Sequence, residues 1–409
     1  MITQKNIILA LCVLFFVSLI FSTPLNNISI FLIGVLSFSR LQFRKKITLL
    51  YREPSFLIFA FYTFMSVMGL ILTENLANGI KVLERNASFL LLPLFIIGNK
   101  DLISKDIFKS ILNVFSCIII LISILSILNC YVITSGAINV EMFYRDNFLQ
   151  FTKMQPMYFA LYISLAGIYA WYSVIEYLGN KKWLLSIAMF VVVGFALMVN
   201  ILLATRMTII ALIIALFIIT IFKTKKIMLG VAFIIICGLC AFIVIKNSPI
   251  LYDRYYEISA TKFSPPLGIY YNSVNLRVAH WKCSLELSKE NFWFGVGIGD
   301  VQDQLNVCYR SKNWSPILYE NNYNCHCQYF QTLLGMGILG LISLITLLLY
   351  PIVISYKIKD FISIGFFVLI IISAFTESLF SSQKAIVFFS FFAALFVAFY
   401  ENSKLSPQE

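Results

Sequence analysis

Long apolar runs, separated by short polar segments, recur along the whole chain. Each run is close to the roughly 20 residues that a helix needs to cross the hydrocarbon layer of a bilayer. The pattern predicts twelve membrane-spanning helices, over residues 7–22, 25–39, 55–72, 84–98, 109–130, 154–176, 183–203, 206–222, 227–245, 328–354, 361–376 and 384–401. We therefore expect an all-α polytopic membrane protein in which residues 1–409 form a single integral membrane domain.

The composition supports this interpretation. Hydrophobic residues make up 60% of the chain and charged residues only 12%, with a mean hydropathy of +0.89. That leaves too little polar surface to cover a soluble globule of 409 residues. The segment Ile20–Pro24 has no small-x-small cleavage site, so we expect the first run to be a span rather than a cleaved signal peptide.

The net charge of +12 is compatible with nucleic-acid binding, but the positions of the basic residues argue against it. Alternate short connections are basic, as the positive-inside rule requires of cytoplasmic segments. These basic residues are Lys5, Arg40, Arg44, Lys45, Lys46, Arg52, Lys100, Lys105, Lys109, Lys181, Lys182, Lys223, Lys225, Lys226, Lys357, Lys359 and Lys404. We expect both termini in the cytoplasm and residues 246–327, between spans nine and ten, as one large loop on the outer side.

That outer loop contains a predicted amphipathic helix from Asn275 to about Glu290. Four residues form its apolar stripe, and Arg277 and Trp281 lie one turn apart on another face. The stripe consists of Leu276, Ala279, Cys283 and Leu287. The glycine-rich turn Gly295–Asp300 follows no strand, which disfavours a nucleotide cradle, and we expect it to fit closely against a lipid or a sugar.

Four cysteines, Cys283, Cys308, Cys325 and Cys327, lie in or at the edge of the outer loop. In an oxidising compartment they could form one or two disulfides, and the sequence leaves the pairing open. A zinc site at Cys325-His326-Cys327 is not expected, because no second Cys/His pair stands at zinc-binding spacing.

Arg206 lies between two long apolar runs that are joined by a very short turn. An unpaired arginine at membrane depth costs roughly 2.5–3.5 kcal/mol. Its guanidinium could reach the lipid headgroups, or it could face a buried anionic ligand. A planar, permanently charged group suits phosphate oxygens, so we favour the second interpretation.

Arg277 and His326 are two further candidates. Arg277 could pair within the loop with Asp253, Glu257 or Glu286, or bind a ligand. His326 begins span ten, where a helix N-terminus favours neutral imidazole that can accept a proton near pH 7, although a capping or packing role is the common alternative. We assign the other histidine, His280, to packing.

Two basic residues at the start of span four, Lys81 and Arg85, are spaced i, i+4 and can point the same way. They could complement a diphosphate or merely anionic lipid. A further outer connection, Tyr131–Lys153, carries Glu141, Arg145, Asp146 and Lys153, and we expect it to help cover the site.

Several motifs together resemble the O-antigen ligase family over roughly residues 200–400. They are Leu-Leu-Ala-Thr-Arg206-Met, Arg277-x-x-x-Trp281 followed by Phe294-Gly-Val-Gly-Ile-Gly299, and His326-x-x-Tyr-Phe-Gln331 with the glycines to Gly340. Glu377-Ser-Leu-Phe-Ser-Ser-Gln383 resembles the family's C-terminal pattern. The family often has Asn after the histidine and Ser before the first arginine, where this chain has Cys327 and Thr205.

The resemblance implies a membrane-embedded glycosyltransferase of GT-C-like architecture in the bacterial inner membrane, with a periplasmic active site. It would transfer a polysaccharide from undecaprenyl diphosphate to a sugar hydroxyl of lipid A-core, with inversion and without a metal or cofactor. Arg206 and Arg277, helped by Arg85 and Lys81, would hold the diphosphate, and His326 would be the general base. Partners would be these two substrates and membrane lipids, with no nucleic acid.

Alternatives stay open at this point. An O-antigen polymerase uses the same donor, and a protein O-oligosaccharyltransferase is a further variant. A transporter or flippase is the distant alternative, because the chain has no matched halves. A purely structural membrane protein is the last.

Overall fold

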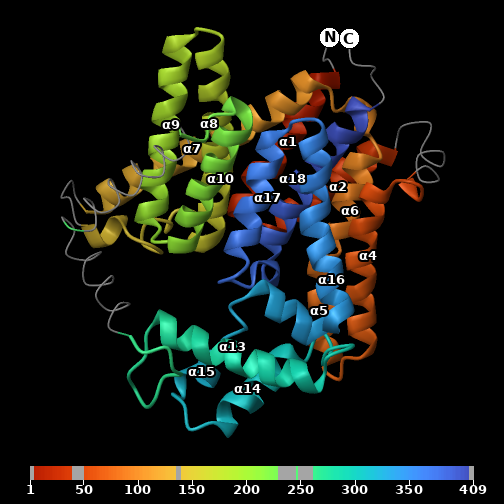
Figure 1. Cartoon of the computed structure of the whole chain (residues 1–409), viewed down its shortest axis with the longest axis vertical. Helices are drawn as coiled ribbons and strands as arrows, with labels where there is room; N and C mark the ends of the chain where they lie inside the picture. The colour runs from red at the N-terminus through yellow and green to blue at the C-terminus, as the bar shows by residue number, and fades with distance from the viewer. Residues whose placement is uncertain (1–3, 39–49, 135–139, 229–245, 247–260, 405–409) are drawn as a thin grey trace.

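The structure is a computed structural model, and it describes residues 4–38, 50–134, 140–228, 246 and 261–404. Within these ranges it contains helices and no strands. The helices form an upright bundle, and the segment from α13 to α15 lies across one end of it (Figure 1). The beginning of α1 and the end of α18 lie at the opposite end of the bundle. Nearly all of predicted span 227–245, together with Cys237, Cys240, Asp253 and Glu257, falls outside the described residues.

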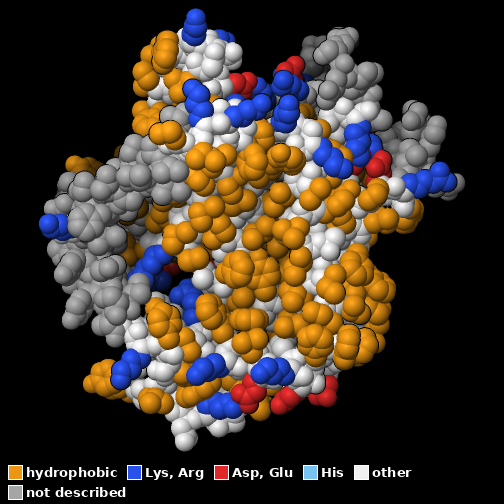
Figure 2. Space-filling model, viewed as in Figure 1, with side chains coloured by type: hydrophobic (Ala, Val, Ile, Leu, Met, Phe, Trp, Pro, Cys, Tyr) orange, Lys and Arg blue, Asp and Glu red, His pale blue; other side chains and the backbone are white. Residues whose placement is uncertain are grey.

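Among the described residues, eight helices are long and apolar enough to cross a membrane. They are α1 Gln4–Phe21, α4 Pro54–Ile71, α7 Lys105–Ile133, α8 Pro156–Gly179, α9 Trp183–Leu202, α10 Arg206–Thr224, α16 Gln328–Lys357 and α18 Gln383–Ser403. Two shorter apolar helices are α2 Thr23–Phe38 and α17 Phe361–Ser373. Hydrophobic side chains cover the middle of the visible face, and Lys and Arg gather towards its two ends (Figure 2). A polytopic all-α membrane protein is confirmed; twelve spans and a GT-C-like architecture stay predictions.

The centre of the bundle is built around α18 and α8, whose membrane-spanning windows are 89% and 83% buried. Both helices are apolar on all sides, which is typical of a helix surrounded by others. Phenylalanine rings of α18 pack against aromatic rings of neighbouring helices. The ring centroids of Phe392 and Phe115 are 4.7 Å apart, and those of Phe388 and Tyr162 are 4.4 Å apart. Close packing of this kind holds helices together where lipid offers no hydrophobic contrast.

Predicted span 84–98 differs from the observed structure. Residues there belong to α5 Leu76–Asn86 and α6 Ser88–Ile97, which meet at Ala87 with helical backbone angles. The helix begins earlier than predicted because Asn75 caps it, accepting a hydrogen bond from the backbone N–H of Asn78. The outer turns of α5 are amphipathic, and only α6 is apolar throughout.

The outer segment contains α13 Ser273–Glu290, α14 Val301–Ser311 and α15 Ile317–Glu320. Asn272 and Asn275 form a capping box at the start of α13. The predicted apolar stripe is confirmed: Leu276, Ala279 and Cys283 are buried in a small separate core. The 3-10 turns η1 Lys100–Leu102, η2 Val140–Phe143 and η3 Leu379–Ser381 complete the described elements.

A disulfide joins Cys283 of α13 to Cys308 of α14. Cys325 and Cys327 are buried free thiols, so no disulfide constrains His326 in this structure. Burial raises the pKa of the Cys325 thiol to about 12, which keeps it protonated and unreactive near neutral pH.

The glycine-rich turn packs against protein backbone, not against an open surface. A Cβ atom on Gly295 would lie 2.6 Å from the carbonyl oxygen of Leu334, and one on Gly297 would lie 2.8 Å from the Cα of Thr73. Gly337, where α16 kinks at φ +67°, faces the carbonyl oxygen of Trp293. The expectation of a lipid or sugar fit is therefore wrong: these glycines let the outer segment dock on α4 and α16.

Candidate active site

The turn between α17 and α18, residues 374–382, is clamped by three other parts of the chain. Gln328, the first residue of α16, donates its backbone N–H to Ala374 and accepts the N–H of Phe380 with its side chain. Arg85 of α5 donates to the carbonyl oxygen of Ser381 at 2.9 Å. These hydrogen bonds fix the turn, and with it the carboxylate of Glu377.

Glu377 contacts both Arg277 and His326. Its Oε1 accepts a hydrogen bond from Nη2 of Arg277 at 3.1 Å, and its Oε2 lies 3.3 Å from Nδ1 of His326. Burial raises the pKa of Glu377, but the contacts and charges of His326 and Arg277 outweigh burial and hold that pKa below its ordinary value. Glu377 is therefore a carboxylate at neutral pH.

Arg277 is held in place by the backbone as well. Its Nη1 donates to the carbonyl oxygen of Ser273 at 3.1 Å and its Nε to that of Thr376 at 3.4 Å. Three of its five N–H groups are thereby used, so the guanidinium is fixed while donors remain for a further anion.

His326 lies just before α16, with its backbone in the left-handed region at φ +42°. Its N–H donates to Oδ1 of Asn324 at 2.9 Å, and its carbonyl oxygen accepts from the Trp281 indole at 3.4 Å. Its ring stacks on the ring of His280, with centroids 4.9 Å apart. A non-glycine residue in this region costs on the order of 1–3 kcal/mol, so surrounding contacts must hold it there.

His280 is buried, and neither ring nitrogen has a hydrogen-bond partner among the described residues. Burial, together with the nearby charges of His326 and Arg277, lowers the pKa of His280 to about 2. Its ring is therefore neutral, which agrees with the packing role expected for it.

Two cavities meet at Glu377. The first, which we call the Arg277 pocket, has a volume of about 520 Å³ and brings Arg277 of α13 together with Arg206, the first residue of α10. Arg145, from the predicted outer connection, also lines it. A hollow edged by basic side chains is visible towards the left of Figure 2. The structure thus brings two arginines that are distant in sequence into one cavity.

The second cavity, which we call the His326 pocket, has a volume of about 580 Å³ and shares Gln155 and Glu377 with the first. Its cationic residues are Arg85, Lys153 and Lys384. The side chain of Lys81 is exposed and lines neither cavity, unlike that of Arg85. A role for Lys81 in binding stays a prediction.

Residues 191–345 match the family model described as O-antigen ligase. The matched region contains Arg206, Arg277 and His326. This part of the chain is similar to the O-antigen ligase family. A search of curated proteins found no match to the chain. The similarity supports an enzyme of ligase or polymerase type that acts on saccharide and lipid substrates in a membrane.

The partner of Arg277 in the structure, Glu377, was not among the three acidic residues expected from the sequence. Glu286 pairs instead with Lys312 at 2.7 Å, and Asp253 and Glu257 lie outside the described residues. Glu377 was singled out only as part of a C-terminal motif. One signal could have identified it: Glu377 is an acidic residue at the outer end of two apolar spans. A carboxylate in such a place needs a cationic partner.

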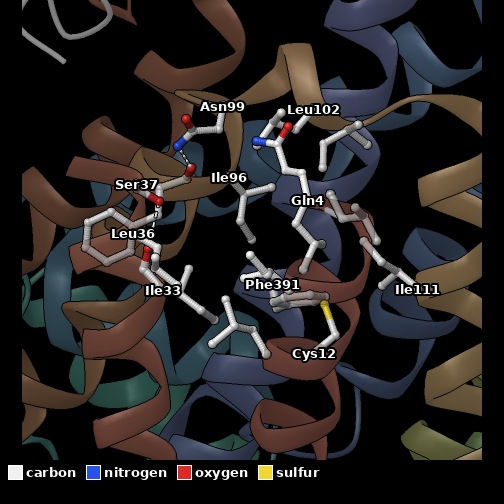
Figure 3. A pocket seen from close by; sticks show the side chains of 16 residues that line it. Gln4, Cys12, Ile33, Leu36, Ser37, Ile96, Asn99, Leu102, Ile111 and Phe391 are labelled. Atoms are coloured by element: carbon white, nitrogen blue, oxygen red, sulfur yellow. Dashed lines mark hydrogen bonds between the residues drawn. The ribbon is translucent and has the colours of Figure 1, made fainter. Parts of the chain in front are cut away.

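An apolar cavity of about 290 Å³ lies at the other end of the bundle, between α1, α2, α6, α7 and α18 (Figure 3). Gln4, Ser37 and Asn99 are its polar lining residues, and the remainder is apolar, including Cys12 and Phe391. No acid, base or cation lines it among the described residues, so we place the family's chemistry at Glu377 and not here.

Proposed function

We propose that this protein is an O-antigen ligase of the bacterial inner membrane. It transfers a polysaccharide from undecaprenyl diphosphate to a sugar hydroxyl of lipid A-core on the periplasmic face. The observation that carries the proposal is the double contact of Glu377, which links a histidine to an arginine at the meeting point of two cavities. The family match supports the reaction class, and the donor, acceptor and membrane are our inference.

His326 is the general base of the proposed reaction. We assign the imidazole proton to Nδ1, which lies 3.3 Å from Oε2 of Glu377, and this leaves Nε2 to take a proton. Nε2 removes the proton of the acceptor hydroxyl as its oxygen attacks the anomeric carbon of the donor. A general base contributes typically 10²–10⁴-fold to such a step.

Arg206 and Arg277 stabilise the leaving group. The bond between the anomeric carbon and the phosphate oxygen breaks as the new glycosidic bond forms, and both electrons stay on undecaprenyl diphosphate. Two guanidinium groups lining one cavity suit the growing negative charge on that phosphate. A single displacement of this kind inverts the anomeric configuration and needs no metal. Lys81 stays a further candidate for contact with the diphosphate, whereas Arg85 lines the neighbouring cavity and not the one that contains Arg206 and Arg277.

The first test replaces His326 and Arg277 separately by Ala in purified protein. We expect transfer from lipid-linked polysaccharide to lipid A-core to fall by roughly 10²-fold or more in each variant, because the first loses the general base and the second a cation that binds the diphosphate and stabilises the leaving group. Product is measured by gel shift of the glycolipid, with an unchanged unfolding temperature as the folding control. EDTA should leave turnover unchanged. Near-normal turnover in both variants would sink the mechanism.

A second test separates ligase from polymerase. Deletion of a ligase leaves bare lipid A-core, while full-length polymer accumulates on its lipid carrier. Surviving core that carries a single repeat unit would instead identify a polymerase. Intact polymer on the core, with loss of glycan from a secreted protein, would identify a protein O-oligosaccharyltransferase.

A further inference from the structure

The His326 pocket carries more positive charge than a neutral sugar requires. Three cations, Arg85, Lys153 and Lys384, line it, against one carboxylate, Glu377, which Arg277 already pairs. These cations come from three separate parts of the chain: α5, the turn before α8, and α18. An uncompensated cluster of this kind is a site for anions.

Two of the three cations are held by hydrogen bonds to backbone carbonyl oxygens. Arg85 uses Nε and Nη1 for the carbonyl oxygens of Lys81 and Ser381, and among the described residues no acceptor takes Nη2. Lys384 donates to the carbonyl oxygen of Ile20 at 2.7 Å, which leaves two of its three N–H groups. Lys153 is exposed, and its side chain reaches the pocket from the turn before α8. The donors of Arg85 and Lys384 are thus presented on a preformed frame, which lowers the entropic cost of binding.

The rest of the pocket lining suits a saccharide. Hydroxyl and amide groups, each able to donate and accept, surround the cations. They belong to Thr23, Gln155, Tyr158, Asn324, Ser378, Ser381, Ser382 and Gln383. His326 lies among them, so a sugar held here would have its hydroxyl groups near the proposed base.

We propose that the His326 pocket binds the acceptor, and that its cations select an acceptor saccharide bearing phosphate or carboxylate groups. This inference rests on the proposed function, because it assumes that His326 activates the acceptor hydroxyl. The donor diphosphate then occupies the Arg277 pocket, and the two substrates meet at Glu377, which both cavities share.

The experiment uses the purified full-length protein in nanodiscs, with lipid-linked polysaccharide as donor. Three acceptors are compared: lipid A-core, the same material dephosphorylated, and the same material with its carboxylates reduced to alcohols. We expect at least one of the two neutralised acceptors to show a KM raised by roughly tenfold, with kcat little changed, as the loss of a charge-assisted hydrogen bond predicts. A raised KM for the dephosphorylated acceptor would identify phosphate as the group that is bound, and a raised KM for the reduced acceptor would identify carboxylate.

Lys153→Gln should raise KM for untreated lipid A-core and leave KM for the neutralised acceptor unchanged. Lys289→Gln is the matched control, because Lys289 is exposed in the last turn of α13 and lines neither cavity. It should behave as wild type. High salt should weaken binding of the untreated acceptor more than binding of the neutralised one.

Equal KM values for all three acceptors would overturn the inference while leaving the proposed function standing. So would a rise in KM for Lys153→Gln that is the same with charged and neutralised acceptors. Absence of transfer to lipid A-core in any form, with transfer to another acceptor, would overturn the proposed function itself and this inference with it.

Discussion

The helix bundle and the outer segment are held together by different forces. In the bundle, α18 is surrounded by phenylalanine rings such as Phe115 and Phe366, and apolar packing is dense. In the outer segment, α13 and α14 enclose a small apolar core that a disulfide crosses. The outer segment docks on the bundle through backbone contacts at Gly295, Gly297 and Gly337.

The proposed site lies where these two regions meet. Arg277 comes from the outer segment, Glu377 and Arg206 come from the bundle, and His326 lies at the joint where α16 begins. Neither region has the complete set of groups. Variants that weaken one region or the joint should therefore have effects that differ in kind, and these effects can be ranked.

The largest effect is expected at the joint itself, from Glu377→Gln. The amide keeps the shape of the side chain but loses the charge that orients His326 and pairs with Arg277. We expect kcat to fall on the order of 10²-fold, with a smaller change in KM. Single-turnover transfer assays measure this.

Glu286→Gln is its matched control, since Glu286 pairs with Lys312 away from both cavities. If Glu377→Gln and Glu286→Gln turned over equally well, Glu377 would have no part in the site.

A smaller effect is expected from Gly337→Ala, which separates the two regions. An added Cβ would meet the carbonyl oxygen of Trp293 at 2.2 Å, and the φ of +67° already disfavours any side chain. Together these should cost roughly 2–6 kcal/mol. Hydrogen exchange should show faster exchange around 292–300, with α8 and α18 unchanged.

Gly194→Ala provides the comparison within α9, because nothing lies within 4 Å of an added Cβ there. That variant should be neutral or slightly stabilising. Equal exchange rates in the two variants would mean that the glycine contacts do not hold the outer segment.

Removal of the disulfide by Cys283→Ser with Cys308→Ser should affect the outer segment alone. The bond closes a loop with a sequence separation of 25, and its loss should cost about 2–4 kcal/mol. Limited proteolysis should cut between α13 and α14 in the variant before the bundle is cut. Cys117→Ser, at an exposed free cysteine of α7, should leave the pattern as in wild type; identical cleavage of all three proteins would contradict the prediction.

The smallest effect is a dependence on pH. Because the folded protein holds the pKa of Glu377 below its ordinary value of 4.5, the carboxylate stabilises the fold fully above pH 4.5. That stabilisation is lost as the pH falls through the lower, folded-state pKa. The difference in unfolding free energy between wild type and Glu377→Gln should be present at pH 5 and shrink in more acidic buffer. A difference that did not shrink as the pH fell below 4.5 would contradict it.

Most of the bundle was predictable from the sequence, because apolar runs report directly on helices in lipid. The exception, around residues 84–98, arose where the helix extends beyond the apolar run: α5 is amphipathic and begins at Leu76, outside the hydrophobic stretch. The length of an apolar run does not show how far the helix continues into the polar residues beside it. The helix α13 was predictable because its stripe of Leu276, Ala279 and Cys283 has helical spacing.

The site was predictable in part. Arg206, Arg277 and His326 were found through residue type, position and family resemblance, and the structure places Arg206 and Arg277 in one cavity and His326 in the adjoining one. Glu377 was missed because the partner of Arg277 lies 100 positions away. Pairing across that distance depends on the docking of α13 on the turn before α18. The partition into two cavities could not be read from residue spacing at all.

One contact outside the site has a mechanical consequence. The carboxylate of Asp300, at the start of α14, accepts the backbone N–H groups of Glu74 and Asn75 at 2.7 and 2.8 Å, just ahead of α5. The helix that carries Arg85 is thereby coupled to the segment that carries Arg277. A tilt of the outer segment that widened one cavity would drag the beginning of α5 along and reshape the other. Filling of either cavity should therefore change the affinity of the other for its substrate, and the Asp300 carboxylate is the contact that carries this coupling.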